Sequence, residues 1–210
     1  MSYLASHYIE LLGTLCSLIY LVYAIPGKPA LWVWGIISAA LYIVVFYNGK
    51  FYADMTLQFY YLGVSIYGLY NWLHYKKPAA DTYSETDSKT KADMPISRTP
   101  AREWVYLAIA SALIFVAYYL VLNYLTDSPL PVCDSLTTAL SITATWMLTQ
   151  KRIEYWLVFV FVDAFSACLY AYRGLYPSAL LFIIYTVMAI IGYRRWHKEL
   201  FADIETKYMG

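Results

Sequence analysis

Residues 153–171 read IEYWLVFVFVDAFSACLYA, an apolar run broken near its middle by a single carboxylate, Asp163. A helix needs about 20 mostly apolar residues to cross a bilayer. Similar runs recur along the chain, separated by turn formers or charges such as Pro26-Gly27-Lys28-Pro29. We expect seven spans, at residues 6–25, 30–47, 52–73, 103–126, 131–149, 153–171 and 175–193. The sequence therefore predicts an all-α integral membrane protein with seven transmembrane helices.

The composition excludes a soluble enzyme. The chain has 210 residues, of which 61% are hydrophobic and 14% charged, whereas soluble domains are about half apolar and about a quarter charged. A net charge of +1 gives no electrostatic case for binding nucleic acid. The cysteines and histidines are scattered, and the spans hold no paired acids and no nucleophile beside a base. We therefore expect no enzymatic activity, no metal and no cofactor.

Residues 74–102 differ from the rest of the chain because they are polar and hold few apolar side chains, which predicts a flexible cytoplasmic linker. Lys and Arg concentrate on the side of this linker, and only Lys50 and Arg173 fall on the other side. This bias predicts an N-terminus outside and a C-terminus in the cytoplasm. The predicted parts are a first three-helix bundle at 6–73, the linker at 74–102, a connecting transmembrane helix at 103–126, a second three-helix bundle at 131–196 and a cytoplasmic tail at 197–210.

An offset of 124 residues aligns the two predicted bundles without a gap. The matches in this one register exceed what chance gives among many Tyr and Leu residues. Three spans, one connecting span and three more spans give a 3+1+3 arrangement of parallel repeats. Two such bundles that face each other are typical of a transporter with alternating access. The matched pairs include Glu10 with Asp134, Lys28 with Arg152, Trp32 with Trp156, Tyr61 with Tyr185, Gly68 with Gly192 and Trp72 with Trp196.

Asp163 is the candidate binding residue that this pattern singles out. A carboxylate at mid-membrane depth costs several kcal/mol unless it is paired, solvated or protonated. No Lys or Arg falls at the same depth in the predicted spans, so a structural salt bridge lacks a basic partner. Protonation, or a hydrogen bond to Ser or Tyr, is the alternative structural interpretation. Helical spacing places Trp156, Phe159, Ser166 and Tyr170 on the same face, which favours a site for a flat, cationic or hydrogen-bonding ligand.

Several short motifs, in a fixed order and spacing between Glu10 and Trp196, carry a resemblance to a known family. They are Trp34-Gly35-Ile36-Ile37-Ser38, Tyr52-Ala53-Asp54-Met55-Thr56-Leu57-Gln58, Tyr67-Gly68-Leu69-Tyr70-Asn71-Trp72, Leu140-Ser141, Glu154-Tyr155-Trp156 and Gly174-Leu175-Tyr176. On these motifs the chain resembles the PnuC family of bacterial vitamin transporters, whose fold is similar to that of the SWEET sugar transporters.

Family members that carry nicotinamide riboside share a motif WxxWxxxN, which here reads Trp156, Phe159 and Asp163. The acid in place of the amide makes the chain resemble the thiamine-carrying PnuT branch. The resemblance then implies thiamine as substrate, with Asp163 facing its charge or amino group and the two aromatic rings stacking on it. The alternatives are nicotinamide riboside, which is also cationic, riboflavin or a pyrimidine precursor. The same expectation adds Ser38, Gln58, Tyr61, Ser141, Thr145 and Tyr185 to the binding site.

The resemblance also implies how such a protein works. It implies facilitated diffusion across the bacterial cytoplasmic (inner) membrane by alternating access, after which cytoplasmic phosphorylation traps the vitamin. Proton coupling through Asp163 is the alternative mechanism. Besides the small-molecule substrate and membrane lipids, it implies a homo-oligomer, a trimer. The rival class is a seven-helix receptor or sensor, which the repeat and the absence of a lysine from residues 175–193 disfavour.

Overall fold

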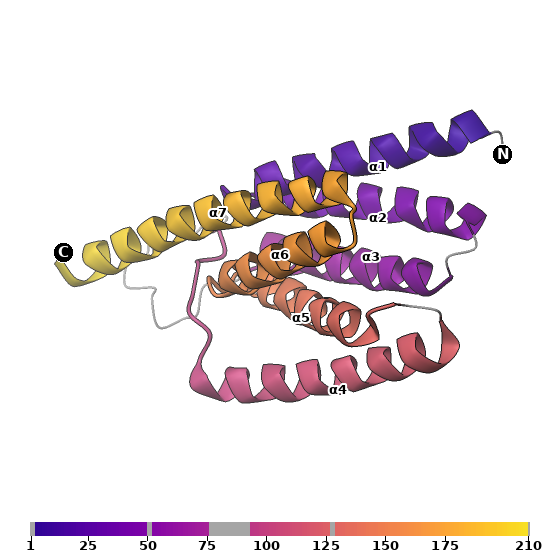
Figure 1. The fold of residues 1–210 in the computed structure, drawn as a ribbon. Coiled ribbons are helices and arrows are strands. Elements are labelled where there is room, and N and C mark those ends of the chain that lie inside the picture. The colour runs from indigo at the N-terminus through magenta and orange to yellow at the C-terminus, as the bar shows by residue number, and fades with distance from the viewer. Residues whose placement is uncertain (1–2, 50–51, 76–92, 127–128, 210) are drawn as a thin grey trace. The chain divides into compact units, whose positions relative to one another are not determined.

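The computed structural model describes residues 3–49, 52–75, 93–126 and 129–209, and these residues form seven α-helices (Figure 1). The observed helices begin and end close to the predicted spans, with the exception of the last. The helices are α1 (Tyr3–Ala24), α2 (Ala30–Gly49), α3 (Tyr52–Leu73), α4 (Ala101–Leu125), α5 (Pro131–Thr149), α6 (Tyr155–Tyr172) and α7 (Tyr176–Met209).

Within the described residues, four helices contain a stretch that is long and apolar enough to cross a membrane. These stretches are Ala30–Asn48, Ala101–Leu125, Tyr155–Tyr172 and Ser178–Ala202. The apolar stretch of α1 is shorter, at Leu12–Ala24, and α3 and α5 carry more amide, hydroxyl and acidic side chains. Polar side chains that bond within a bundle are common in membrane helices, so the seven spans predicted from the sequence remain a proposal for these three helices.

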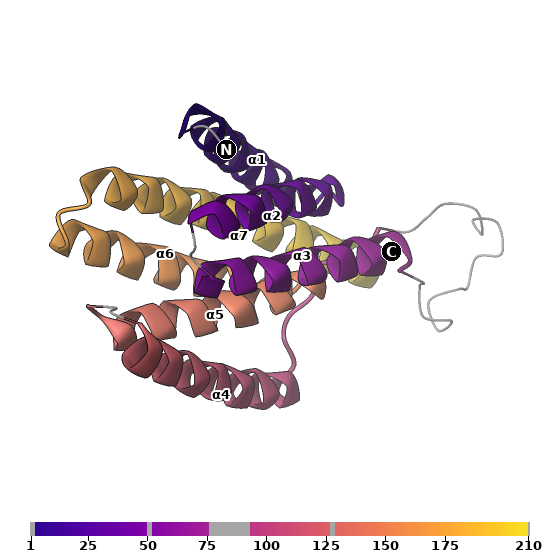
Figure 2. The same ribbon diagram turned by 90° about the vertical axis from the view of Figure 1, so that its right-hand side faces the viewer.

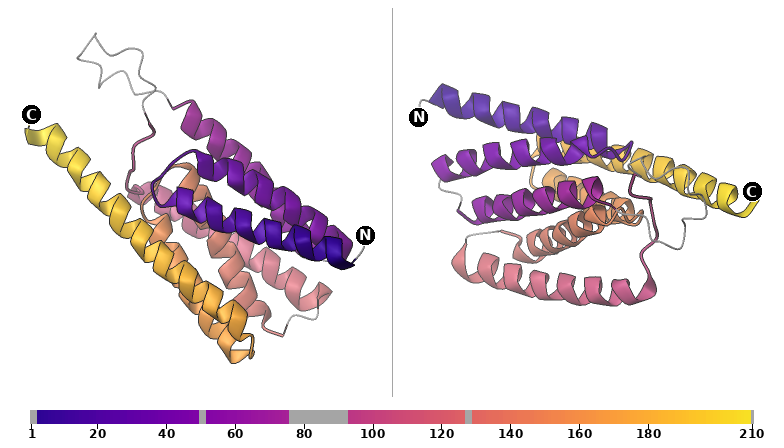
Figure 3. Two further views of the ribbon diagram at one scale, coloured as in Figure 1. Left: turned by 90° about the horizontal axis from the view of Figure 1, so that it is seen from above. Right: turned by 180° about the vertical axis from the view of Figure 1, so that it is seen from behind.

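Helix α7 continues beyond the predicted end of the last span, residue 193, as far as Met209 (Figure 3). Arg195 and Glu199, one turn apart, form an ion pair of 3.1 Å between Nε and Oε1. Trp196 and Leu200 are buried in the same stretch. The segment predicted as a tail is therefore a helical extension of the last span, because its residues combine helix-forming charges with apolar side chains that find a packing surface.

The chain divides into two compact units, Met1–Pro95 with Thr149–Lys151, and Ile96–Leu148 with Arg152–Gly210. In the first unit, α2 packs against both α1 and α3 (Figure 2). Trp32 of α2 is fully buried and meets Trp72 of α3 edge-to-face, with ring centroids 5.5 Å apart. Gly68 makes room for this ring, since a Cβ there would lie 2.5 Å from Trp32. The pair of tryptophans thus forms the centre of the first unit.

In the second unit, α6 packs along α7 (Figure 1). Trp156 is buried and meets Trp196 edge-to-face, with ring centroids 5.8 Å apart, and Gly192 lies directly against the Trp156 ring. Helices α4 and α5 are joined by a hydroxyl hydrogen bond of 2.7 Å between Ser111 and Thr143. The core of this unit repeats the arrangement of two tryptophans and a glycine seen in the first.

The turns that precede α2 and α6 also share their internal geometry. Gly27 and Lys151, 124 positions apart, both have left-handed backbones, with φ of 64° and 52°. The backbone hydrogen bonds match at the same offset: Lys28 N to Tyr23 O and Arg152 N to Met147 O, both 3.1 Å, and Trp32 N to Pro29 O and Trp156 N to Ile153 O, 3.1 and 3.2 Å.

Residues 96–100, which we call the strap, fall within the predicted flexible linker but are held in place in the second unit. The Ile153 amide donates to Ser97 O at 3.0 Å, and the Thr99 amide and hydroxyl donate to Glu154 Oε2 at 3.0 and 2.8 Å. Ile96 and Thr99 are buried. Composition records the polarity of these residues but not the partners that their polar groups find, so the composition of the linker could not indicate these bonds. Residues 76–92 of the predicted linker lie outside the described residues.

Candidate functional site

Asp163 lies near the middle of α6 and is only 7% exposed. Within the described part of the chain, its carboxylate has no hydrogen bond and no ion pair. Neither the salt bridge nor the bond to Ser or Tyr considered from the sequence is formed there. Ser166, almost one turn further along α6, is also buried. A buried carboxylate without a protein partner gains free energy from a cation or a donor that enters its surroundings.

Trp156 and Phe159, the two rings predicted to stack on a ligand, differ in their surroundings. Trp156 is 1% exposed and packed between Gly192 and Trp196, as Trp32 is at the equivalent place in the first unit. Packing therefore accounts for the position of Trp156. Phe159 is only half-buried and contacts Tyr155 edge-to-face, with centroids 6.0 Å apart. Phe159 is the better placed of the two to contact a ligand.

The remaining predicted residues of the second unit lie on α5 and α7. On α5, the Thr145 hydroxyl donates to the Ser141 carbonyl oxygen at 2.7 Å, which satisfies a hydroxyl that would otherwise be buried alone. On α7, Tyr185 meets Phe182 edge-to-face at 5.8 Å, and Phe182 stacks on Tyr170 of α6 at 5.2 Å. These three aromatic side chains form a cluster between α6 and α7.

The predicted residues of the first unit are Ser38 on α2 and Gln58 and Tyr61 on α3, and they differ in the contacts that their side chains make. Ser38 is buried, and its hydroxyl lies 2.7 Å from the Ser17 hydroxyl and 3.2 Å from the Gly13 carbonyl oxygen. This contact joins α1 to α2, as expected of a packing residue. Gln58 of α3 is half-buried, and no described residue bonds its amide. Tyr61 follows Tyr60 on α3, with ring centroids 5.5 Å apart. Among the predicted residues of this unit, Gln58 is therefore the one whose amide is left available for a ligand by the described residues.

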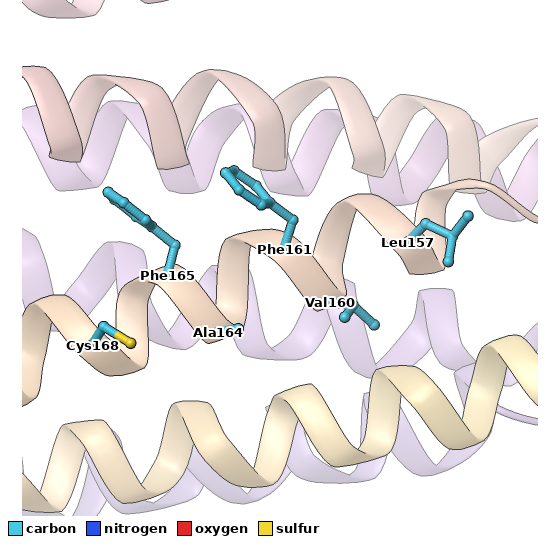
Figure 4. Close-up of a pocket in the computed structure, with 6 residues that line it drawn as sticks. All are labelled: Leu157, Val160, Phe161, Ala164, Phe165 and Cys168. Carbon is cyan, nitrogen blue, oxygen red and sulfur yellow. The ribbon is translucent and has the colours of Figure 1, made fainter.

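A shallow hollow lies on the surface of α6 (Figure 4). Its lining is apolar, and the rings of Phe161 and Phe165 stack beside it with centroids 6.0 Å apart. Because this lining carries no charged side chain and no strong hydrogen-bonding group that could orient a vitamin, we do not take the hollow as the vitamin site. The residues that line it are Leu157, Val160, Phe161, Ala164, Phe165 and Cys168. Elsewhere, the described residues contain no group of three or more His, Cys, Asp or Glu that could hold a metal ion.

The end of α3 has a role that the sequence analysis missed. Asn71 Nδ2 and Trp72 Nε1 both donate to the carbonyl oxygen of Thr149, at 2.9 and 3.1 Å. The ammonium of Lys151 lies 4.7 Å from the centroid of the Trp72 ring. Asn71 and Trp72 belong to a motif quoted above, but their acceptor is far away in the sequence, so no local pattern could identify it.

Comparisons with known proteins agree with this architecture. The family described as nicotinamide mononucleotide transporter matches residues 7–198. The chain is similar to the nicotinamide riboside transporter PnuC of Escherichia coli (strain K12), with 26% identity over 213 residues that cover 90% of this chain and 84% of the relative. It is also similar to the nicotinamide riboside transporter PnuC of Neisseria mucosa, with 28% identity over 194 residues, 89% of this chain and 69% of the relative.

Another similar protein, the riboflavin/roseoflavin transporter RibM of Streptomyces davaonensis, is named for a different substrate. It is 26% identical over 191 residues, which cover 89% of this chain and 83% of the relative. Among solved structures, the crystal structure of the vitamin B3 transporter PnuC matches with a TM-score of 0.66 and 24% identity, over 92% of this chain and 82% of that chain. At this identity the likeness shows the fold.

Proposed function

The chain belongs to the PnuC family of membrane transporters, and from this premise we propose that it carries a flat, cationic, vitamin-derived ligand across the bacterial inner membrane. The relatives described above are named for nicotinamide riboside or riboflavin, and none of them for thiamine. The names of these relatives favour nicotinamide riboside, the alternative considered from the sequence, over thiamine, the substrate placed first there. Nicotinamide riboside is therefore the substrate that we place first.

Thiamine stays a second candidate because of one observation, the buried carboxylate of Asp163. Its carboxylate is without a partner among the described residues, and it replaces the amide of the nicotinamide riboside motif. A carboxylate accepts a hydrogen bond from the aminopyrimidine of thiamine and offsets the charge of its thiazolium ring. It offsets the positive nicotinamide ring equally well, so charge alone supports both ligands.

Three side chains are the best supported for contact with the ligand. Asp163 supplies the charge, Phe159 supplies an accessible ring for stacking, and Gln58 supplies an amide that can donate and accept. The Ser38 hydroxyl already bonds across to α1, the Thr145 hydroxyl already bonds a carbonyl of its own helix, and the Trp156 ring packs on Trp196. Their substitution should act mainly through stability.

We propose a 3+1+3 arrangement of parallel repeats, with seven spans and the C-terminus in the cytoplasm. The matched tryptophan pairs and the matched turns before α2 and α6 support the repeat. The proposed mechanism is facilitated diffusion, in which the two bundles rock to expose the ligand to either side in turn. Assembly into a trimer, implied by the resemblance, remains part of this proposal.

Calorimetric titration of the detergent-purified protein with nicotinamide riboside, thiamine and riboflavin tests the substrate. We expect nicotinamide riboside to bind and Asp163→Asn to weaken its binding about tenfold, because the variant loses a charge-assisted contact. Asp93→Asn is the matched control, since it removes an exposed carboxylate from the residues before the strap. Binding of thiamine alone would replace the first candidate by the second. Failure of both cationic ligands to bind would contradict the proposed class of substrate, and binding of riboflavin alone would show that the ligand is a flat ring without a positive charge.

A further inference from the structure

Exposed cationic side chains from two elements of the second unit lie close to the ring of Phe201 on α7. Arg194 and Lys198 are one turn apart on α7, and both are exposed. Arg98 of the strap is exposed too, and its Cζ lies 5.8 Å from the centroid of the Phe201 ring. The strap and α7 both belong to the second unit, so this contact lies within one unit. We call Arg98, Arg194, Lys198 and Phe201 the basic face.

The three members of the basic face on α7 share one side of this helix, because they are four and three residues apart. The buried Trp196 and Leu200 lie on the opposite side. The side of the basic face continues towards the start of α7 as a row of exposed apolar side chains, which we call the apolar stripe. Its members are Leu180, Ile183, Val187 and Ile190.

The acids whose ion pairs the structure shows have other cations as partners. Glu103 pairs with Arg152 at 2.7 Å, and Glu199 pairs with Arg195 at 3.1 Å. Among the residues that the structure describes, the cations of the basic face form no ion pair. Like charges one turn apart destabilise a helix. An anion bound at the basic face would therefore relieve this repulsion.

The basic face lies at the depth of the lipid headgroups. The hydrocarbon core is about 30 Å thick, which an upright helix crosses in about 20 residues. When α7 enters the hydrocarbon at its first residues, it therefore leaves it close to Trp196. Arg194 and Lys198, on either side of this point, are then level with the phosphates, and the apolar stripe lies at the depth of the acyl chains.

We propose that the basic face binds the headgroup of an anionic phospholipid, whose acyl chains lie along the apolar stripe. Arg98 donates to the phosphate from the strap, and Lys198 and Arg194 donate to it from α7, as charge-assisted hydrogen bonds. The cations select an anion, and the apolar stripe on the same side of the helix selects a lipid over free phosphate. The bound lipid joins the strap to α7. This site lies in the second unit alone and does not depend on which vitamin is transported.

Native mass spectrometry of the detergent-purified full chain with added phosphatidylglycerol tests the site. We expect Arg98→Gln and Lys198→Gln each to weaken binding about fivefold, the contribution of one cationic side chain near an anionic lipid. Arg102→Gln is the matched control. It removes the same charge from an exposed arginine close to Arg98 in the chain, but this side chain folds onto Tyr106 of α4. An equal loss in all three variants would overturn the site, because only the overall charge of the protein would then matter.

Lys198→Gln leaves the contact between Arg98 and Phe201 intact, so it decides the test even where Arg98→Gln alters the strap. Thermal unfolding of Lys198→Gln without added lipid should match that of the unmodified protein, since the Lys198 side chain is exposed.

Two further ligands separate an anionic lipid from its parts. Phosphatidylcholine with the same acyl chains has no net charge and should bind the unmodified protein more weakly than phosphatidylglycerol. Glycerol phosphate has the anionic group without acyl chains and should not displace phosphatidylglycerol. Equal binding of the two lipids would refute recognition by the basic face. Displacement by glycerol phosphate would show a site for a free phosphate group and would overturn the role of the apolar stripe.

Discussion

At the scale of the single residue, Gly68 has little room for a side chain, whereas Gly63 on the same helix has space around it. A Cβ at Gly68 would lie 2.5 Å from the Trp32 ring, which is itself fully buried against Trp72. We expect Gly68→Ala to lower the free energy of unfolding by roughly 1–3 kcal/mol, as overpacking of a core does. Thermal unfolding of the detergent-solubilised protein measures this loss.

Gly63 provides the control on the same helix, since no atom would lie within 4 Å of its added Cβ. Gly63→Ala should raise stability by about 0.5–1 kcal/mol, because alanine loses less backbone entropy in a helix. Equal effects of the two substitutions would mean that the close approach of Trp32 to Gly68 does not limit stability.

At the scale of the element, the strap and the start of α6 depend on Arg152. Its guanidinium binds Glu103, the Ser97 hydroxyl and the Arg98 carbonyl, and the ion pair is only 22% exposed on each side. We expect Arg152→Ala to cost about 2 kcal/mol of stability, because a partly buried charge loses its partner. Hydrogen exchange at the Ile153 amide, which donates to Ser97 O, should become faster.

The exposed ion pair of Arg195 and Glu199 on α7 is the matched comparison. Both side chains are about half exposed, and pairs of this kind contribute only about 0.3–0.5 kcal/mol. Arg195→Ala should therefore change thermal unfolding far less than Arg152→Ala. A loss from Arg195→Ala as large as that from Arg152→Ala would contradict the larger contribution expected of the less exposed pair.

At the scale of the whole molecule, the proposed orientation can be tested directly. Single cysteines at the exposed positions Tyr176 and Lys198, near the start and towards the end of α7, should react with an impermeant thiol reagent from opposite sides of the membrane. We expect position 176 to react from outside and position 198 only after the cells are opened, because positive side chains are retained in the cytoplasm. The reverse pattern would invert the orientation.

How much the sequence predicts depends on whether the signal is local. The helices follow from apolar runs bounded by turn formers, so their number and bounds agree with the structure for α1 to α6. The strap could not be predicted, because the groups that hold Ser97 and Thr99 lie more than 50 positions away, at Arg152, Ile153 and Glu154.

In the candidate site, too, the sequence predicts what a local signal can show and misses what depends on residues far away in the chain. Mid-span position and missing basic partners single out Asp163, and the structure leaves it buried and unpaired among the described residues. Helical spacing alone predicted that Trp156 and Phe159 both contact a ligand. The packing of Trp156 against Gly192 and Trp196 shows that the two rings have different surroundings. Periodicity gives the face of a helix but not what covers that face.

The length of α7 makes this helix a rigid spacer. Its 34 residues extend about 51 Å at 1.5 Å per residue, whereas the hydrocarbon core is about 30 Å thick. For an upright α7 that enters the hydrocarbon at its first residues, about 20 Å of continuous helix stands beyond the hydrocarbon, on the side of the C-terminus. A fluorescent protein fused to the end of α7 in unbroken helical phase would be held at that distance from the membrane. Its polarised emission would then follow any rotation of α7 about its own axis.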